Sequence, residues 1–306
     1  MRPIFDISSL RAGGFTLVEM ITSLAILGIL SAIVASFLQI PIQGYFDVSR
    51  RAQLTDAADL ALRRMSRELQ GALPNSARVT GACGGGAPCY LEFLEVRTAG
   101  RYRAESGGGA ACPTGNDALV FGMADGCFTT LGSTPDLGLV LSGDFLVVYN
   151  LGPGFADANA YAPVGPGSNR VGLAALPTAG AVAAPPEDRF TFPLHIFPLA
   201  SPGNRFHIVS GPVTYECLPS PAPGVGTLVR HSGYAISAAQ PAPPAGGANT
   251  LLATGVTTCL FSYTGNVVAQ RNGVVLMALG LSHVVPGSLV ADNVTLFNQA
   301  QVSNTP

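Results

Sequence analysis

Hydrophobic residues follow three different patterns along the chain. Between residues 17 and 38 nearly every position is apolar, and Glu19 is the only charge. Between residues 54 and 73 apolar residues recur every three or four positions, with charged residues mostly between them. Beyond residue 74, short β-branched and aromatic runs alternate with clusters rich in glycine and proline. These patterns predict helical segments first and strands afterwards.

The first apolar run is long enough to cross a membrane. A helix over residues 17–38 would measure roughly 33 Å, close to the thickness of the hydrocarbon core of a bilayer. A carboxylate inside hydrocarbon costs about 2.5–3.5 kcal/mol, so Glu19 needs a role or a partner. One role is local, because Thr16 and Glu19 have the spacing of a capping box that satisfies main-chain N–H groups at a helix start.

A short polar leader with two arginines and one aspartate precedes this run. It is not typical of a secretory signal, because the apolar run is too long, Glu19 interrupts it, and no Ala-x-Ala site follows. Cleavage after Gly14 would instead leave the apolar helix on the mature chain. The new α-amino group at Phe15 would lie about one helical turn from Glu19, or close to Glu19 of a neighbouring subunit.

The stretch GFTLVE, residues 14–19, with an apolar helix behind it, resembles the class III signal of type IV prepilins and type II secretion pseudopilins. The resemblance implies cleavage between Gly14 and Phe15 by a prepilin peptidase/methyltransferase, with N-methylation of Phe15. It implies that Glu19 acts in assembly by meeting the amino terminus of an adjacent subunit. Other pilins and the inner-membrane assembly machinery are the partners that it implies.

The second pattern predicts an amphipathic continuation of the helix over residues 41–73, ended by Pro74 and Asn75. Pro41 is expected to kink or briefly break the helix, because its ring removes one main-chain hydrogen bond. The stripe is expected to pack on the protein's own sheet, although a partner-binding face is an alternative. Its apolar members are Leu54, Ala58, Ala61, Leu62, Met65, Leu69 and Leu73.

Strands are predicted at residues 90–97, 118–122, 145–150, 206–209, 213–217, 227–230, 257–263, 274–281 and 288–297. Loops are predicted at residues 152–189, 218–226 and 240–249, which are rich in Gly, Pro and Ala. The pilin resemblance implies an α+β fold, in which a long N-terminal helix packs on an antiparallel β-sheet with long loops. The expected organisation is a leader (1–14), a transmembrane and assembly helix (15–40), its amphipathic continuation (41–73) and a β-rich periplasmic domain (74–306).

Several later stretches resemble a narrower family, the O-type minor prepilins of the mannose-sensitive haemagglutinin pilus, which are themselves similar to J-type secretion pseudopilins. These stretches are PIQGYFDVSRRAQLTDAADLALRRMSRELQGALPNS (residues 41–76), GRYR (100–103), VTYEC (213–217), LVRHSGY (228–234), VTTCLFSY (256–263) and QVSNTP (301–306).

All six cysteines lie beyond the apolar run. An even number on one side of a span suits disulfides in an oxidising periplasm. Neighbours in sequence suggest the pairs Cys83 with Cys89, Cys112 with Cys127, and Cys217 with Cys259, although fifteen connectivities are possible. No metal site is expected, because the chain has neither a Cys-x-x-Cys spacing nor histidines near the cysteines.

Composition argues against several functions. All 16 basic residues are arginine, which removes a Walker A lysine and a Schiff-base lysine. We find no Gly-x-Ser-x-Gly, His-Glu-x-x-His or post-strand Gly-x-Gly-x-x-Gly, so neither an enzyme nor a cofactor is expected. The net charge of −2 predicts no sequence-independent attraction to nucleic acid.

Three functional hypotheses remain. In the first, the chain is a minor pilin that initiates, caps or assembles a type IV pilus. It would be anchored by one helix in the bacterial inner membrane, with its C-terminal domain in the periplasm, and would later join the pilus at the cell surface. In the second, it is a ligand-binding tip pilin, recognisable by a concave aromatic or polar pocket. In the third, it is a J-like pseudopilin of a type II secretion system.

Overall fold

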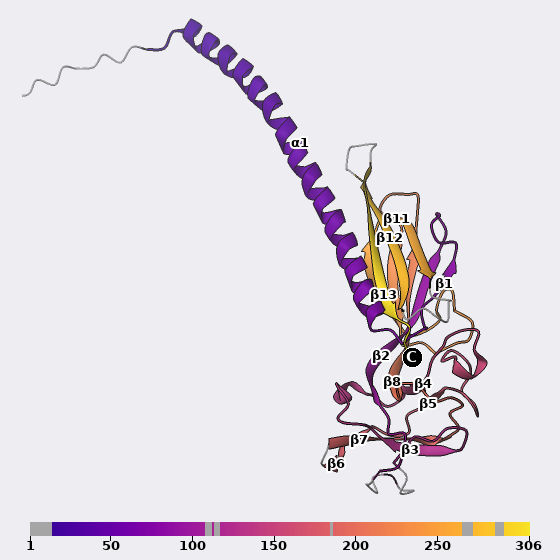
Figure 1. Ribbon diagram of the computed structural model, residues 1–306. Helices are drawn as coiled ribbons and strands as arrows, with labels where there is room; N and C mark the ends of the chain where they lie inside the picture. The colour runs from indigo at the N-terminus through magenta and orange to yellow at the C-terminus, as the bar shows by residue number, and fades with distance from the viewer. Residues whose placement is uncertain (1–13, 108–111, 113–116, 184–185, 265–271, 285–290) are drawn as a thin grey trace, which may run out of the picture. The chain divides into compact units, whose positions relative to one another are not determined.

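The computed structural model describes residues 14–107, 112, 117–183, 186–264, 272–284 and 291–306 (Figure 1). Its fold class is α+β, with a long N-terminal helix followed by antiparallel sheets. The chain divides into two compact units, Met1–Ala52 and Gln53–Pro306. The division falls inside the helix.

Helix α1, Leu17–Gln70, continues through Pro41, so the expected break does not occur. A proline removes only one main-chain donor from the helix. The helix ends at Gln70 rather than near Leu73. Two hydrogen bonds of the tighter i to i−3 kind close its last turn, and the N–H of Leu73 donates instead to the carbonyl of Leu94, at 2.8 Å. The main chain therefore leaves the helix here and forms a hydrogen bond with the strand that contains Leu94.

The described residues of the larger unit form three antiparallel sheets. The first has seven strands, in the order β1 (Arg78–Gly81), β2 (Cys89–Arg101), β8 (Arg205–Leu218), β4 (Phe145–Val148) and β5 (Arg170–Gly172), with β9 (Thr227–Ser232) paired to β8 and β10 (Ala248–Thr254) paired to β9. The second consists of β11 (Val256–Thr264), β12 (Asn272–Val284) and β13 (Ala291–Ser303), and the third of β3 (Asp125–Thr129), β7 (Pro186–His195) and β6 (Thr178–Ala183). Short 3-10 helices lie at Leu137–Leu139 and Ala156–Ala158.

Three of the local predictions were wrong. Residues 118–122 form no strand: the carboxylate of Asp125 accepts the N–H of Val120 at 2.9 Å, where a strand neighbour would otherwise accept it. Residues 206–209 and 213–217 belong to one strand, β8, because shifts of register against β2 carry it across the gap. The predicted loop 152–189 contains β5, β6 and the start of β7. Strands β5 and β7 pair with β4 and β3, which lie much earlier in the chain, and β6 forms a hairpin with β7.

The second part of α1 packs into the main core, as the apolar stripe predicted. Its buried side chains contact residues of β2 and β8 and of the three-stranded sheet β11–β13. Met65 and Leu69 are fully buried there, so truncating either one to alanine should cost about 2–5 kcal/mol. The helix residues in this core are Ala58, Ala61, Leu62, Met65 and Leu69.

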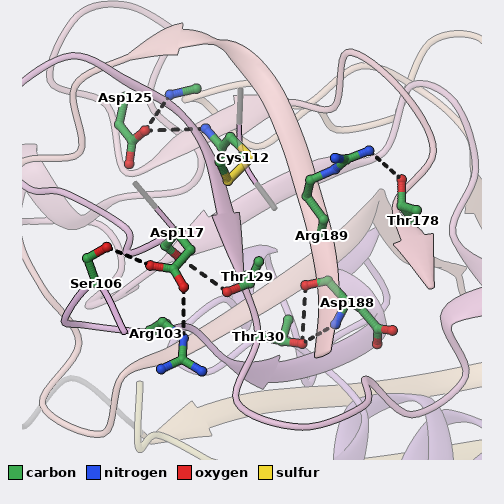
Figure 2. Close-up of a disulfide and its surroundings, with 12 residues drawn as sticks. Arg103, Ser106, Cys112, Asp117, Asp125, Thr129, Thr130, Thr178, Asp188 and Arg189 are labelled. Carbon is green, nitrogen blue, oxygen red and sulfur yellow. Dashed lines mark hydrogen bonds and ion pairs between the residues drawn. A yellow bond between two sulfur atoms is a disulfide. The ribbon is translucent and has the colours of Figure 1, made fainter. Parts of the chain in front are cut away.

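A second core, rich in phenylalanine, is formed by residues that include members of β3, β4, β7 and the start of β8. The rings of Phe128 and Phe190 stack at 5.4 Å, and Phe206 meets both edge-on. Figure 2 shows the polar layer in this region, where Arg103 pairs with Asp117 and the hydroxyl of Ser106 donates to the same carboxylate at 2.8 Å. Such paired groups allow carboxylates to be buried.

Three disulfides join Cys83 with Cys89, Cys112 with Cys127, and Cys217 with Cys259, the pairs that neighbourhood in sequence suggested. The third connects β8 to β11 and so joins two different sheets. Both of its cysteines are buried in the main core.

An ion-pair network fastens α1 to the first sheet. Glu68, near the end of the helix, accepts hydrogen bonds from the Tyr215 hydroxyl at 2.7 Å and from Arg230 Nε at 2.8 Å. Arg64 donates to its other oxygen at 3.0 Å, and Arg230 also reaches Glu95 on β2. Burial alone would raise the pKa of Glu68, but the hydrogen bonds from Arg230, Tyr215 and Arg64 outweigh burial and hold the pKa below its ordinary value.

We predict that Glu68→Gln lowers the free energy of unfolding by about 1.5–3 kcal/mol at neutral pH, because it removes charge-assisted hydrogen bonds from a half-buried site. A lowered folded-state pKa contributes stability that is present above the ordinary value of 4.5 and is lost as the pH falls through the folded value. The difference between wild type and variant should therefore shrink in acid.

Denaturant unfolding of the detergent-solubilised protein at neutral and acidic pH measures this difference. Asp59→Asn is the control, because Asp59 pairs with Arg63 on the exposed side of the same helix and should matter little. A difference that is equal at both pH values would contradict the assignment of the stability to the Glu68 charge.

Candidate functional site

The candidate site is the start of α1, residues 14–19. Of the predicted processing segment, Gly14 and Phe15 are described, whereas residues 1–13 lie outside the described part of the chain. Residues 14–16 are not helical, and α1 begins at Leu17. Thr16 therefore takes the N-cap position, and Glu19 is the third residue of the helix.

Thr16 and Glu19 form a complete capping box. The main-chain N–H of Glu19 donates to Thr16 Oγ1 at 3.3 Å, and the N–H of Thr16 donates to Glu19 Oε2 at 3.0 Å. The Thr16 hydroxyl donates to the same carboxylate oxygen, also at 3.0 Å. Two orphan N–H groups are thus satisfied reciprocally, as the sequence spacing predicted.

The cap satisfies hydrogen bonds but does not neutralise the charge. Within the described part of the chain no cation forms an ion pair with Glu19, and its second carboxylate oxygen has no hydrogen bond. Two other polar side chains of this segment donate hydrogen bonds to main-chain carbonyls of the same helix. Thr22 donates to the Val18 carbonyl at 3.0 Å, and Ser36 donates to the Ile33 carbonyl at 2.9 Å. Glu19 is therefore the one group of this segment whose charge still needs a partner.

The predicted cleavage junction is open. Phe15 is 85% exposed, and a Cβ built on Gly14 would meet no described atom within 4 Å. The junction lies just before the helix, in residues without regular secondary structure. A protease could therefore reach this peptide bond without unfolding α1.

The apolar face of the helix is unburied. Leu17–Leu38 is the one stretch of the described chain long and apolar enough to cross a membrane, with a mean hydropathy of 2.3, and none of it is buried. Removing a large apolar side chain from water is worth about 1.5–3 kcal/mol. This surface needs a bilayer or other helices around it. Its large members include Ile21, Leu24, Leu27, Leu30, Val34 and Phe37.

Elsewhere in the described chain, the potential metal ligands and the histidines do not form a second cluster. No group of three potential metal ligands occurs among the residues that the structure describes. His195 Nε2 lies 2.7 Å from the Ser168 carbonyl, and His231 Nε2 lies 2.7 Å from Glu216 Oε2, in two different sheets. Both imidazoles therefore have local structural partners.

Comparison with known proteins gives one match. A family model described as the prokaryotic N-terminal methylation motif matches residues 10–35, which include the capping box and most of the apolar run. No curated protein and no solved structure matches the chain.

The motif supports the class of type IV prepilins and pseudopilins, whose members are structural pilin subunits rather than enzymes. It implies processing by a prepilin peptidase and assembly with other pilins. The single apolar helix fits a membrane-anchored pilin.

Proposed function

We propose that the chain is a minor subunit of a type IV pilus that acts in initiation, capping or assembly of the fibre. One observation carries the proposal: the first part of α1 exposes an apolar surface that its own fold leaves uncovered, with an uncompensated carboxylate at its start. A bilayer can cover the apolar surface before assembly, and a bundle of sister helices can cover it afterwards.

Before assembly, the subunit crosses the bacterial inner membrane once, with the leader in the cytoplasm and residues 74–306 in the periplasm. The three disulfides support this orientation, since they belong in an oxidising compartment. The later stretches that resemble O-type minor prepilins favour a minor subunit. A J-like secretion pseudopilin would use the same helix.

Processing after Gly14 creates the partner that Glu19 lacks. The new α-amino group at Phe15, which is then N-methylated, carries a positive charge one turn before Glu19. In a bundle of parallel helices the amine of one subunit meets the carboxylate of the next, in a low-dielectric setting where a lone charge costs several kcal/mol. A single buried charge pair also fixes the register between helices.

We predict that Gly14→Val blocks processing. A peptidase that reads the residue before the cut needs close approach of the backbone, which a β-branched side chain obstructs. Neither Gly14 nor Gly28 has a neighbour within 4 Å of a built Cβ, so valine should disturb the fold at neither site. Gly28→Val is therefore the matched control. Intact-mass measurement should find the leader retained in the first variant and removed from the control; efficient removal in both would contradict the proposed site.

We predict that Glu19→Gln enters the membrane and loses its leader normally, but is recovered with partner pilins about tenfold less than wild type. We expect this loss because the variant leaves the positively charged amino group at Phe15 of the neighbouring subunit without its partner in the bundle. Glutamine keeps the reach needed for the cap, so the defect separates charge from capping.

Thr16→Val provides the complementary variant, because it removes the hydroxyl of the cap and keeps the Glu19 charge. If charge pairing drives assembly, this variant should co-purify with partner pilins nearly as well as wild type. Normal recovery of Glu19→Gln together with poor recovery of Thr16→Val would reduce Glu19 to a helix cap.

A further inference from the structure

A cavity of about 740 Å³ opens in the larger unit. Its walls come from the chain between α1 and β1, the start of β1, the loop that follows β4, the start of β8, the end of β11 and the last residues of the chain. Its volume lies in the range of sites that hold small-molecule ligands, roughly 300–1,000 Å³. The lining residues used below are Asn75, Arg78, Tyr149, Phe155, Arg205 and Tyr263.

The charged side chains on the cavity wall have one sign, and the last residue, Pro306, lines the wall beside them. Two arginines line the cavity and no Asp or Glu side chain does. The charge of Arg78 is already used, because its guanidinium pairs with Glu92 at 2.6 Å and stacks 3.6 Å from the centre of the Tyr161 ring. Arg205 has no hydrogen bond or ion pair to its side chain within the described part of the chain. The cavity therefore presents one guanidinium that lacks an anion.

The backbone around the cavity is strained. Four described non-glycine residues have positive φ, and three belong to this region: Asn75 (58°), Tyr149 (53°) and Asn204 (52°), which adjoins Arg205. A bulky residue such as Tyr149 rarely adopts this conformation. Gly152 completes the arrangement, since a Cβ there would come within 2.5 Å of the Asn75 carbonyl. Such strain concentrates at ligand sites, where the surrounding structure holds it in place.

The remaining surface combines aromatic rings with hydrogen-bonding groups. Tyr149, Phe155 and Tyr263 line the cavity and provide flat apolar faces. The Tyr263 hydroxyl donates to Asn304 Oδ1 at 3.2 Å, which leaves its oxygen able to accept. A hydroxylated ring matches this mixture, because its C–H faces pack on aromatic rings while its hydroxyl groups bind around the edge.

We propose that this cavity binds a saccharide that carries an anionic group, held through its charge by Arg205. The guanidinium fork binds a carboxylate or a phosphate through two parallel hydrogen bonds. The aromatic walls position the sugar ring. This binding activity goes beyond the assembly role and does not depend on it, since every lining residue lies in the larger unit.

Titration calorimetry on the full chain, in a detergent without a sugar headgroup, tests the proposal with four probes. Sodium glucuronate should bind with a Kd of about 1 mM or tighter, and glucose should bind about tenfold more weakly because it lacks the charge. Glucose 6-phosphate distinguishes a phosphate from a carboxylate as the preferred anion, and binding of either anionic sugar supports the site. Triglutamate represents an acidic peptide.

Arg205→Gln should weaken binding of the anionic sugar about tenfold. Arg101→Gln is the matched control: Arg101 lies opposite Arg205 in the β2–β8 register, is exposed, and does not line the cavity. Its effect should stay within about twofold. Thermal melts should show that both variants remain folded, since neither guanidinium forms an ion pair within the described chain.

Three results would overturn the proposal. One is the absence of binding by either anionic sugar at about 10 mM, far above the expected Kd. Another is an equal loss in Arg205→Gln and Arg101→Gln, which would reflect overall charge. The third is tighter binding of triglutamate than of the sugars, which would make the cavity a peptide site.

Discussion

The apolar surface of residues 17–38 must be removed from water by something other than this fold, and much of the molecule follows from that requirement. Every large apolar side chain of this stretch is exposed, although each would gain about 1.5–3 kcal/mol from burial. The chain needs a bilayer first and, in the proposed function, other helices later. Glu19 would be a poor choice for a permanent membrane anchor, but it suits a helix that exchanges lipid for neighbours carrying a free amine.

The later part of the same helix is covered by the protein's own fold. From residue 58 onward its apolar side chains enter the main core between two sheets, and Glu68 binds Tyr215 and Arg230 of the first sheet. The disulfide between Cys217 and Cys259 joins those two sheets behind the helix. Loop closure of this length contributes about 4 kcal/mol in the chain-entropy account. The larger unit therefore holds its end of α1 through packing and charge, and the disulfide joins the two sheets against which the helix packs.

Local sequence signals predicted the features that depend on neighbouring residues. The capping box followed from the spacing of Thr16 and Glu19, and the buried stripe followed from the three- and four-residue periodicity. Features that depend on distant partners escaped prediction. Strand β5 pairs with β4 and strand β7 pairs with β3, in each case across a long stretch of intervening chain, and the composition of residues 152–189 made this region resemble a loop.

The difference between local and distant partners also explains why the sequence did not indicate the Glu68 contacts or the cavity. The Glu68–Arg230 contact joins residues 162 positions apart, so no local pattern indicates it. The cavity beside Arg205 is lined by segments from five parts of the chain, and its strained residues, Asn75 and Tyr149, have ordinary sequence surroundings. The sequence left a ligand-binding tip pilin open as an alternative, but it indicated no position for a pocket.

The central claim is that α1 leaves the membrane and enters a fibre with a processed amino terminus. The most direct measurement is mass spectrometry of the amino-terminal peptide from fibres sheared off the cell surface. The account predicts that this fraction contains the chain beginning at N-methylated Phe15. Recovery of the chain only in the membrane fraction, or in fibres with residues 1–14 still attached, would contradict it.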